Sequence, residues 1–205
     1  MYHRSAGKHK GSRGKSQQAR DRVGQVRIIA GRWRGTRLQV PDLAGLRPSG
    51  DRTRETLFNW LQAWLPGAQC LDLFAGSGAL GFEAASRGAG KVLLVDSQAT
   101  VIREISAVRE RLEAVDTEAI HADALDWLRN CKQSFDIIFV DPPFADELHQ
   151  QAIDLLLEHG LLKPGGWLYA EVPSGTTMIT PSRLEISKEK RIGDVQLYLF
   201  RHASK

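Results

Sequence analysis

A glycine-rich turn between a short apolar strand and a helix constrains this sequence more than any other feature. Residues 70–74 read Cys-Leu-Asp-Leu-Phe and lead into glycines at positions 76, 78 and 81, after which we expect a helix through Ser86. Glycine allows a sharp turn and a close approach of the backbone to a ligand. The spacing therefore favours a nucleotide-like ligand, although an ordinary strand–helix turn can have the same pattern.

Strands and helices alternate after this turn. The expected strands are 92–95, 117–121, 136–140 and 167–172, the expected helices are 100–113 and 146–160, and a pair of strands follows at 183–190 and 194–202. The inner strands are continuous apolar runs, which is typical of a parallel sheet covered on both faces. We predict an α/β, Rossmann-like fold with a mostly parallel seven-stranded sheet and helices on both faces.

Four acidic residues mark the carboxyl ends of the predicted strands. Asp72 lies within the first strand, and three more lie at or just beyond the ends of the next three strands, namely Asp96, Asp123 and Asp141. Ligands of open α/β sheets bind at the carboxyl ends of the strands. We therefore expect a binding site at this edge of the sheet.

The acids distinguish S-adenosylmethionine from a dinucleotide. Asp96, 20 residues after Gly76, suits ribose hydroxyls. Asp72 suits a cationic amino group and would repel a pyrophosphate, and Asp123 could accept a hydrogen bond from an adenine amino group. The predicted cofactor is S-adenosylmethionine, bound by Asp72, Phe74, Gly76, Gly78, Asp96, Asp123 and Ala124. As single residues, Asp72 and Asp123 could instead be helix caps.

The segment Asp141-Pro142-Pro143-Phe144 predicts the reaction site. The Asp141 carboxylate and the Pro142 carbonyl are two acceptors suited to an amino group, and Phe144 offers a face for a flat ring. Acceptors that hold both amine protons aim the nitrogen lone pair at the methyl carbon, so positioning supplies much of the catalysis. Asp141 could also take the proton, and the base must be unstacked to enter. The alternative is an ordinary Pro-Pro loop after a strand.

The positive charge of the chain is concentrated before the glycine turn. Residues 1–54 hold 14 Lys and Arg against three acids, whereas the remainder holds 14 against 21. We expect a disordered basic tail at 1–24, a hairpin and helix extension at 25–66 with its helix at 51–64, and the catalytic domain at 67–205. Trp33 could either stack on a base or pack onto the core. The arginines before the glycine turn suit phosphate, namely Arg27, Arg32, Arg34, Arg37, Arg47, Arg52 and Arg54. The candidate RNA-binding residues are Arg32, Trp33, Arg34, Arg47 and Arg52.

Other features exclude several classes of protein. No apolar run approaches the roughly 20 residues of a membrane span, and no secretory signal is visible. Cys70 and Cys131 are far apart and form no ligand cluster, so we expect no metal and a cytoplasmic location. We also expect a monomer.

The sequence resembles a known family in four places. Asp72 to Gly81, which reads D-L-F-A-G-S-G-A-L-G, resembles the first motif of class I methyltransferases, and D-P-P-F resembles the motif of amino-methyltransferases of nucleic acids. The runs R-I-I-A-G-R-W-R-G and R-P-S-G-D-R-T-R-E-T-L-F-N-W-L resemble the bacterial 16S ribosomal RNA guanine-N2 methyltransferases, the RsmD family, over roughly Val26 to His202. The resemblance implies methylation of the 2-amino group of one guanine in 16S ribosomal RNA, within an assembled or partly assembled 30S subunit.

Two departures from the family pattern concern the cofactor. The ribose-binding acid is usually Glu in the family and is Asp96 here, and a second acidic position is Gln98. Both changes could weaken cofactor affinity. Three alternatives stay open: a DNA adenine amino-methyltransferase, a non-catalytic RNA-binding assembly factor, and a nicotinamide oxidoreductase, which Asp72 and D-P-P-F disfavour.

Overall fold

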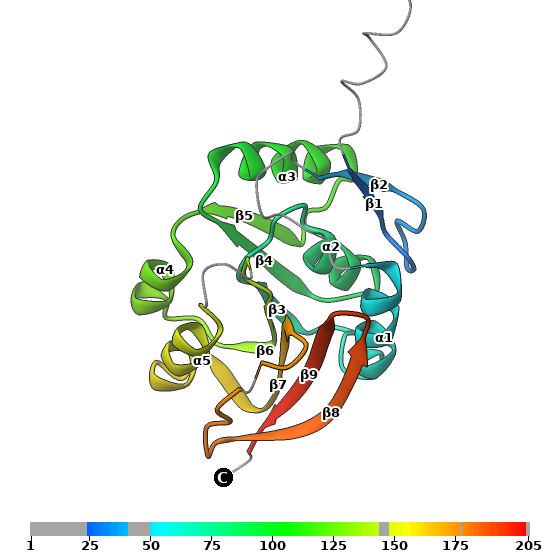
Figure 1. Ribbon diagram of the computed structural model, residues 1–205. Helices are drawn as coiled ribbons and strands as arrows, with labels where there is room; N and C mark the ends of the chain where they lie inside the picture. Colours follow the sequence, from blue (N-terminus) through cyan, green and yellow to red (C-terminus); the bar gives the residue numbers. More distant parts are fainter. Residues whose placement is uncertain (1–23, 41–49, 144–147, 177, 204–205) are drawn as a thin grey trace, which may run out of the picture.

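A seven-stranded sheet forms the centre of the molecule. The structure is a computed structural model that describes residues 24–40, 50–143, 148–176 and 178–203. The strand order is β5-β4-β3-β6-β7-β9-β8 (Figure 1). The strands are β3 (Gln69–Asp72), β4 (Lys91–Asp96), β5 (Thr117–His121), β6 (Phe135–Val140), β7 (Leu162–Pro173), β8 (Leu184–Ile192) and β9 (Val195–His202). Strands β3 to β7 are parallel, and β9 pairs antiparallel with both β7 and β8.

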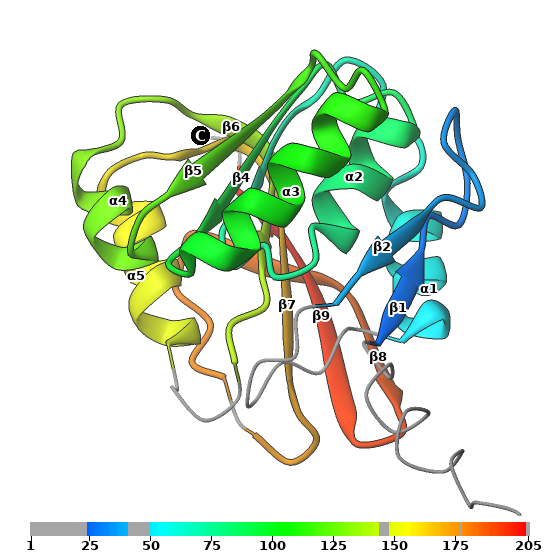
Figure 2. The same cartoon turned by 90° about the horizontal axis from the view of Figure 1, so that it is seen from above.

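Helices cover both faces of the sheet, as the continuous apolar strands predicted. One face packs against α1 (Asp51–Leu61), α2 (Ala79–Ser86) and α3 (Ala99–Arg111), and the other against α4 (Ala124–Asn130) and α5 (His149–Glu158) (Figure 2). The order of the strands reverses between β3 and β6, because the chain first builds outward through β4 and β5 and then returns beside β3. Ligands of open α/β sheets bind at such a switch point.

The segment that precedes β3 packs on the face covered by α2. Strands β1 (Gln25–Arg27) and β2 (Arg37–Gln39) form a separate two-stranded antiparallel sheet, and α1 follows. Apolar residues of all three elements, such as Val26, Leu38 and Phe58, belong to the same buried cluster as the first face of the large sheet. The extension therefore shares a hydrophobic core with the rest of the chain.

The predicted architecture is confirmed, and several boundaries differ from the prediction. Strand β3 ends at Asp72, so Leu73 and Phe74 already belong to the turn. Helix α1 ends at Leu61 rather than Trp64. Strand β7 begins at Leu162 and includes the Pro164-Gly165-Gly166 segment, which we had expected to precede the strand. The register between β6 and β7 shifts there, which accommodates a proline and two glycines inside a paired strand.

Candidate active site at the carboxyl edge of the sheet

The glycine turn leads directly from β3 into α2. Gly76 and Gly78 have φ angles of 52° and 75°, a region that favours glycine, and Gly78 is the N-cap of α2. The turn is closed by the Gly78 amide, which donates to the Ala75 carbonyl at 2.7 Å. A Cβ added at Gly81 would lie 2.7 Å from the Leu94 side chain, so this glycine allows α2 to pack closely on β4. The sequence pattern correctly indicated a turn that requires glycine.

Asp72 is almost fully buried beneath this turn. Its Oδ2 accepts a hydrogen bond of 2.8 Å from the Gly81 amide, in the first turn of α2. Burial is the main cause that raises the pKa of Asp72; the Gly81 hydrogen bond lowers this pKa, the charge of Asp96 raises it, and the net value is about 7. A nearby cation favours the ionised form of such a carboxylate and lowers its pKa. The arrangement suits the ammonium of a bound cofactor, while the Gly81 bond also gives Asp72 the capping role considered above.

Asp96 and Asp123 hold backbone amides at the ends of β4 and β5. Asp96 accepts from the Gly76 amide at 2.9 Å and from the Gln98 amide at 2.8 Å, so it fixes the glycine turn against the end of β4. Asp123 is the N-cap of α4 and accepts from the Asp126 amide at 3.0 Å. Phe74 is half-buried and Ala124 is buried, both against the second face of the sheet. All these predicted cofactor residues therefore lie at one edge.

The D-P-P-F motif lies at the same edge, directly after β6. Since β6 is the parallel neighbour of β3, with Phe139 opposite Asp72, the motif adjoins the strand end that carries the glycine turn. Asp141 is half-buried, Pro142 is buried and Pro143 is exposed. Phe144 lies outside the described residues. The structure thus brings the predicted reaction segment and the predicted cofactor turn together at the switch point.

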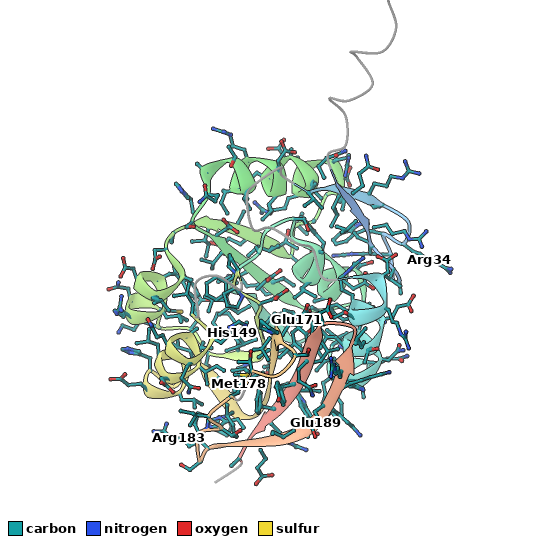
Figure 3. All side chains as sticks on the ribbon, in the orientation of Figure 1. Arg34, His149, Glu171, Met178, Arg183 and Glu189 are labelled. Atoms are coloured by element: carbon teal, nitrogen blue, oxygen red, sulfur yellow. The ribbon has the colours of Figure 1, made fainter. Side chains whose placement is uncertain are left out.

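Three residues that we did not predict lie near the D-P-P-F motif: Tyr169 and Glu171 of β7, the strand that neighbours β6, and His149 of α5. Tyr169 is fully buried, and its hydroxyl donates to Glu171 Oε2 at 2.9 Å. Burial, together with the charges of Glu171 and Asp141, raises the pKa of Tyr169 well above its usual value. The ring of His149, the first residue of α5, bonds the Glu171 carbonyl through Nε2 at 2.6 Å (Figure 3). A glutamate inside the apolar run of an expected strand was the signal available in the sequence.

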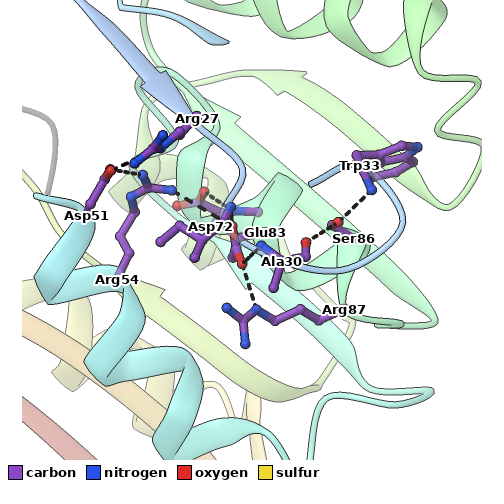
Figure 4. A network of polar contacts seen from close by, with 11 residues as sticks. Arg27, Ala30, Trp33, Asp51, Arg54, Asp72, Glu83, Ser86 and Arg87 are labelled. Atoms are coloured by element: carbon purple, nitrogen blue, oxygen red, sulfur yellow. Dashed lines mark hydrogen bonds and ion pairs between the residues drawn. The ribbon is translucent and has the colours of Figure 1, made fainter. Parts of the chain in front are cut away.

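Glu83 anchors the N-terminal extension to α2 (Figure 4). Its buried carboxylate accepts from the Ile29 and Ala30 amides at 2.6 and 3.0 Å and from Arg87 Nε at 2.6 Å. One turn later, the Ser86 hydroxyl donates to the Ala30 carbonyl and accepts from the Trp33 amide. The loop between β1 and β2 is thereby held by the helix that begins at the glycine turn.

Arg54 is buried beside Glu83, so our interpretation of this arginine as a phosphate contact was wrong. Its Nη2 donates to Asp51 at 2.7 Å, and its Nη1 lies 3.9 Å from Glu83 Oε2. A guanidinium with no exposed surface cannot reach RNA, and its charge is balanced by two carboxylates. Arg54 therefore joins α1 to the anchor of the extension.

The other candidate RNA-binding residues have different environments. Arg34 and Arg52 are exposed, and Arg32 pairs with Asp116. Trp33 is half-buried, packs edge-on against Phe82, and has the Arg32 guanidinium 3.9 Å over its ring. These contacts favour the packing alternative for Trp33. Arg47 lies outside the described residues.

The described residues hold neither a candidate metal cluster nor a helix suited to crossing a membrane. No group of three or more His, Cys, Asp or Glu side chains within these residues is placed to hold a metal ion. No helix in the same part of the chain has the length and hydrophobicity that a membrane crossing requires.

Comparison with known proteins identifies the family. Residues 26–201 match the family described as conserved hypothetical protein 95. The chain is 44% identical to the ribosomal RNA small subunit methyltransferase D of Haemophilus influenzae, over 87% of this chain and 95% of that protein. The Escherichia coli protein of the same name is 41% identical over 86% and 90% of the two chains. The chain belongs to the small subunit methyltransferase D family.

A solved structure agrees with this family membership. A putative methyltransferase from Escherichia coli superposes with a TM-score of 0.81 at 40% identity, covering 89% of this chain and 100% of that one. The resemblance that the motifs indicated is thus confirmed for the family and for the fold. The comparisons identify the family and do not assign roles to individual residues of this chain.

Proposed function

We propose that this protein transfers a methyl group from S-adenosylmethionine to the 2-amino group of a guanine in 16S ribosomal RNA. One observation carries the proposal. Asp141 and Pro142 follow β6 beside the glycine turn of β3, in a chain 44% identical to a protein named ribosomal RNA small subunit methyltransferase D. This adjacency supports the proposal, because a cofactor held at the glycine turn and an amine held by Asp141 and Pro142 would meet at one edge of the sheet.

The residues at the glycine turn fit S-adenosylmethionine. Asp72 supplies a buried carboxylate for the ammonium of the cofactor, and Asp96 is an acceptor for ribose hydroxyls at the next strand end. Asp123 or the neighbouring backbone would hold the adenine, with Phe74 and Ala124 beside it. When bound, the cofactor supplies an activated methyl group on a sulfonium, so the protein does not need to form a covalent intermediate.

In this proposal, the residues of the chain orient the amine that is methylated. The lone pair of an exocyclic base amine is delocalised into the ring, which makes the nitrogen a poor nucleophile. The Asp141 carboxylate and the Pro142 carbonyl would accept hydrogen bonds from the two amine hydrogens and favour a more tetrahedral nitrogen, whose lone pair is aimed at the methyl carbon. The nitrogen loses a proton as it gains the methyl group, and Asp141 is the acceptor that we assign to it. Phe144 would replace the stacking that the unstacked base loses.

RNA would approach from the side of the N-terminal extension. Arg34 is exposed in the loop between β1 and β2, and Arg52 is exposed in the first turn of α1. Arginine binds phosphate through two parallel hydrogen bonds, so these side chains suit an RNA backbone. We assign Arg32 and Trp33 to the same surface, with Trp33 supporting Arg32 rather than stacking on a base. Arg47 stays a candidate RNA contact on the strength of the sequence alone. The substrate that we assign is the 30S subunit or its assembly intermediate, met in the cytoplasm by a monomer that carries no metal.

The decisive experiment is a methyl-transfer assay with a mass readout. Purified protein and labelled S-adenosylmethionine are incubated with 30S particles from a strain that lacks the corresponding methyltransferase. We expect label in N2-methylguanosine at a single position of 16S ribosomal RNA. Label in N6-methyladenosine, or transfer to DNA instead, would overturn the proposed substrate. Absence of transfer to any of these would favour an assembly factor without catalytic activity.

A further inference from the structure

A pocket lies at the amino edge of the sheet, where the parallel strands begin, and so opposite the glycine turn and the D-P-P-F motif. It has a volume of about 320 Å³ and lies between the segment that joins α1 to β3 and the first residues of β6 and β7. Between the pairs Phe135–Leu162 and Ile137–Trp167, residues 163–166 of β7 pass opposite Asp136 alone. This irregular stretch of β7 lines the pocket, which the proposed reaction does not use.

One wall of the pocket is an exposed tryptophan that contacts a buried one. The ring centroids of Trp64 and Trp167 are 4.4 Å apart, and the ring planes are inclined at 46°. Trp167 is buried, whereas Trp64 is 44% exposed. The contact with Trp167 restrains the Trp64 ring before a ligand arrives, which lowers the entropy that binding costs. A restrained and exposed indole is a surface on which any nucleobase can stack.

The pocket also contains an ion pair that is accessible to a ligand. Lys163 Nζ donates to Asp136 Oδ2 at 2.9 Å, and the Gln69 amide donates to the same oxygen at 2.9 Å. The side chains of Lys163 and Asp136 are 35% and 40% exposed. Lysine is a donor and aspartate an acceptor, so the pair presents both kinds of group side by side. The edges of nucleobases likewise carry donors beside acceptors.

A further cation lies beside the two tryptophans. Arg201 of β9 is exposed and is the cross-strand partner of Trp167. Its guanidinium lies 5.2 Å from the centroid of the Trp167 ring. Arginine binds phosphate through its planar fork of donors and also stacks on aromatic rings. The aromatic wall, the ion pair and this cation therefore match the flat ring, the polar edge and the phosphate of a nucleotide.

We propose that this pocket binds an unpaired nucleotide of the RNA substrate, with the base stacked on Trp64 and its edge against Lys163 and Asp136. Proteins recognise single-stranded RNA by this combination of stacking and hydrogen bonds to base edges. Strand β6 has six residues, so the pocket lies roughly 20 Å from the reaction edge at about 3.3 Å per residue. The pocket is thus a second RNA contact. The inference takes only the RNA partner from the proposed function and needs neither guanine nor methyl transfer.

The first test asks whether a nucleotide reaches Trp64. The full-length protein is labelled with fluorotryptophan, its five tryptophans are followed by fluorine NMR, and Trp64→Phe assigns the Trp64 signal. The monophosphates of adenosine, guanosine, cytidine and uridine are titrated with S-adenosylmethionine present, which keeps them out of the cofactor site. We expect at least one of them to shift the Trp64 signal with a dissociation constant in the millimolar range. A Trp64 signal that no nucleotide shifts would overturn the proposal.

The second test measures affinity for 30S particles. Trp64→Ala should weaken binding by about fivefold to 150-fold, which is the effect of losing one stacked base. Trp64→Phe keeps a ring and should bind within about threefold of the wild type. Val115→Ala is the matched control, because this valine is 92% exposed, precedes β5 at the same edge of the sheet and lies outside the pocket. The single-turnover rate at saturating particles should be the same in all four proteins.

Ultraviolet crosslinking followed by mass spectrometry separates RNA from protein as the occupant. We expect a nucleotide of 16S ribosomal RNA on the peptide that contains Trp64. Weaker binding by Trp64→Ala with a ribosomal protein crosslinked there instead would overturn the assignment to a nucleotide. Should Trp64→Ala unfold, the titration and the crosslink on the wild-type protein still decide.

Failure of this inference is distinguishable from failure of the proposed function. A wild-type protein that does not bind 30S particles would remove the proposed substrate, whereas the nucleotide titration involves no particle and no methyl transfer. If the wild type binds and methylates the particles and Trp64→Ala binds them equally well, the proposed function stands and the second RNA contact is rejected.

Discussion

The carboxylate of Asp72 accepts a hydrogen bond of 2.8 Å from the amide of Gly81, and this contact joins the end of β3 to the first turn of α2. The strand end, the glycine turn and the helix are thereby fixed as one unit. Because the carboxylate is buried and its pKa is about 7, the contact also makes the unit sensitive to pH.

Asp72→Asn should stabilise the protein without cofactor at pH 8. The folded pKa of Asp72 lies above the ordinary value of 3.8, so the folded state binds the proton more tightly than the unfolded state. The stability from this group is therefore fully present below pH 4 and is lost as the pH rises to about 7, by on the order of 2–4 kcal/mol. Asn can still accept from Gly81. Thermal unfolding from pH 5 to 8 should decline less steeply in the variant, and identical profiles would contradict this assignment.

Cofactor binding should release protons near neutral pH. An ammonium beside Asp72 favours the ionised carboxylate, so binding lowers the pKa of Asp72 and affinity falls as the pH drops below about 7. Calorimetry in two buffers with different ionisation enthalpies measures the proton count directly. Proton release that persists in Asp72→Asn would assign the effect to another group.

Asp141→Ala should abolish methyl transfer while cofactor affinity stays within a few-fold of the wild type. Loss of an oriented acceptor costs on the order of 10²–10⁴ in rate. Single-turnover rates on 30S particles, together with calorimetric titration of S-adenosylmethionine, separate the two effects. Near-normal rates in the variant would mean that other groups hold the amine.

Glu83→Gln should loosen the N-terminal extension. It removes the charge that balances Arg54 and Arg87, and breaking a buried charge network costs about 3–5 kcal/mol. The Ile29 and Ala30 amides, which donate to Glu83, should exchange hydrogen much faster, whereas amides of β6 change little. Ser86→Ala is a milder comparison at about 1 kcal/mol. Protection that is unchanged at both amides would show that the loop is held by packing alone.

Removing residues 1–24 should weaken RNA association and leave the chemical step intact. This segment holds seven Lys and Arg and one acid, and a cationic segment acts through phosphate neutralisation that fades with salt. Affinity for the 30S particle should differ between full-length and truncated protein at low salt and converge at high salt. Equal affinities at low salt would assign no RNA contact to the segment, and a lower maximal rate would place part of it at the reacting base.

The sequence was informative where chemistry depends on local spacing. Strand ends, the glycine turn and the acid at each strand end could be predicted, because parallel strands align their carboxyl ends whatever the details of packing. Contacts between residues that are distant in the sequence could not be predicted. Arg54 looked like one of several exposed arginines, and only its packing beside Glu83 shows that it is structural. Glu171 was a weaker signal, because a single charged residue in an apolar run does not reveal which neighbour it faces.

The order in which the last strands pair could not be predicted from the sequence either. Apolar residues predicted two strands after β7, but either of them could pair with it. In the structure β9 lies between β7 and β8, and its Leu197 and Leu199 are buried on the face covered by α1. Strand β8 is mostly exposed, with apolar side chains chiefly near its ends, which suits the edge of a sheet.

This order has a consequence for synthesis on the ribosome. Strand β8 emerges before β9, yet within the described part of the chain it pairs with β9 alone, and β7 also keeps an unpaired edge until β9 arrives. A nascent chain that has reached Ile192 therefore carries an open hydrogen-bonding edge beside apolar β7, which chaperones or a second nascent chain could occupy. The sheet is complete only when Val195–His202 pairs with both β7 and β8. Protection of the new chain against aggregation therefore depends on this last strand.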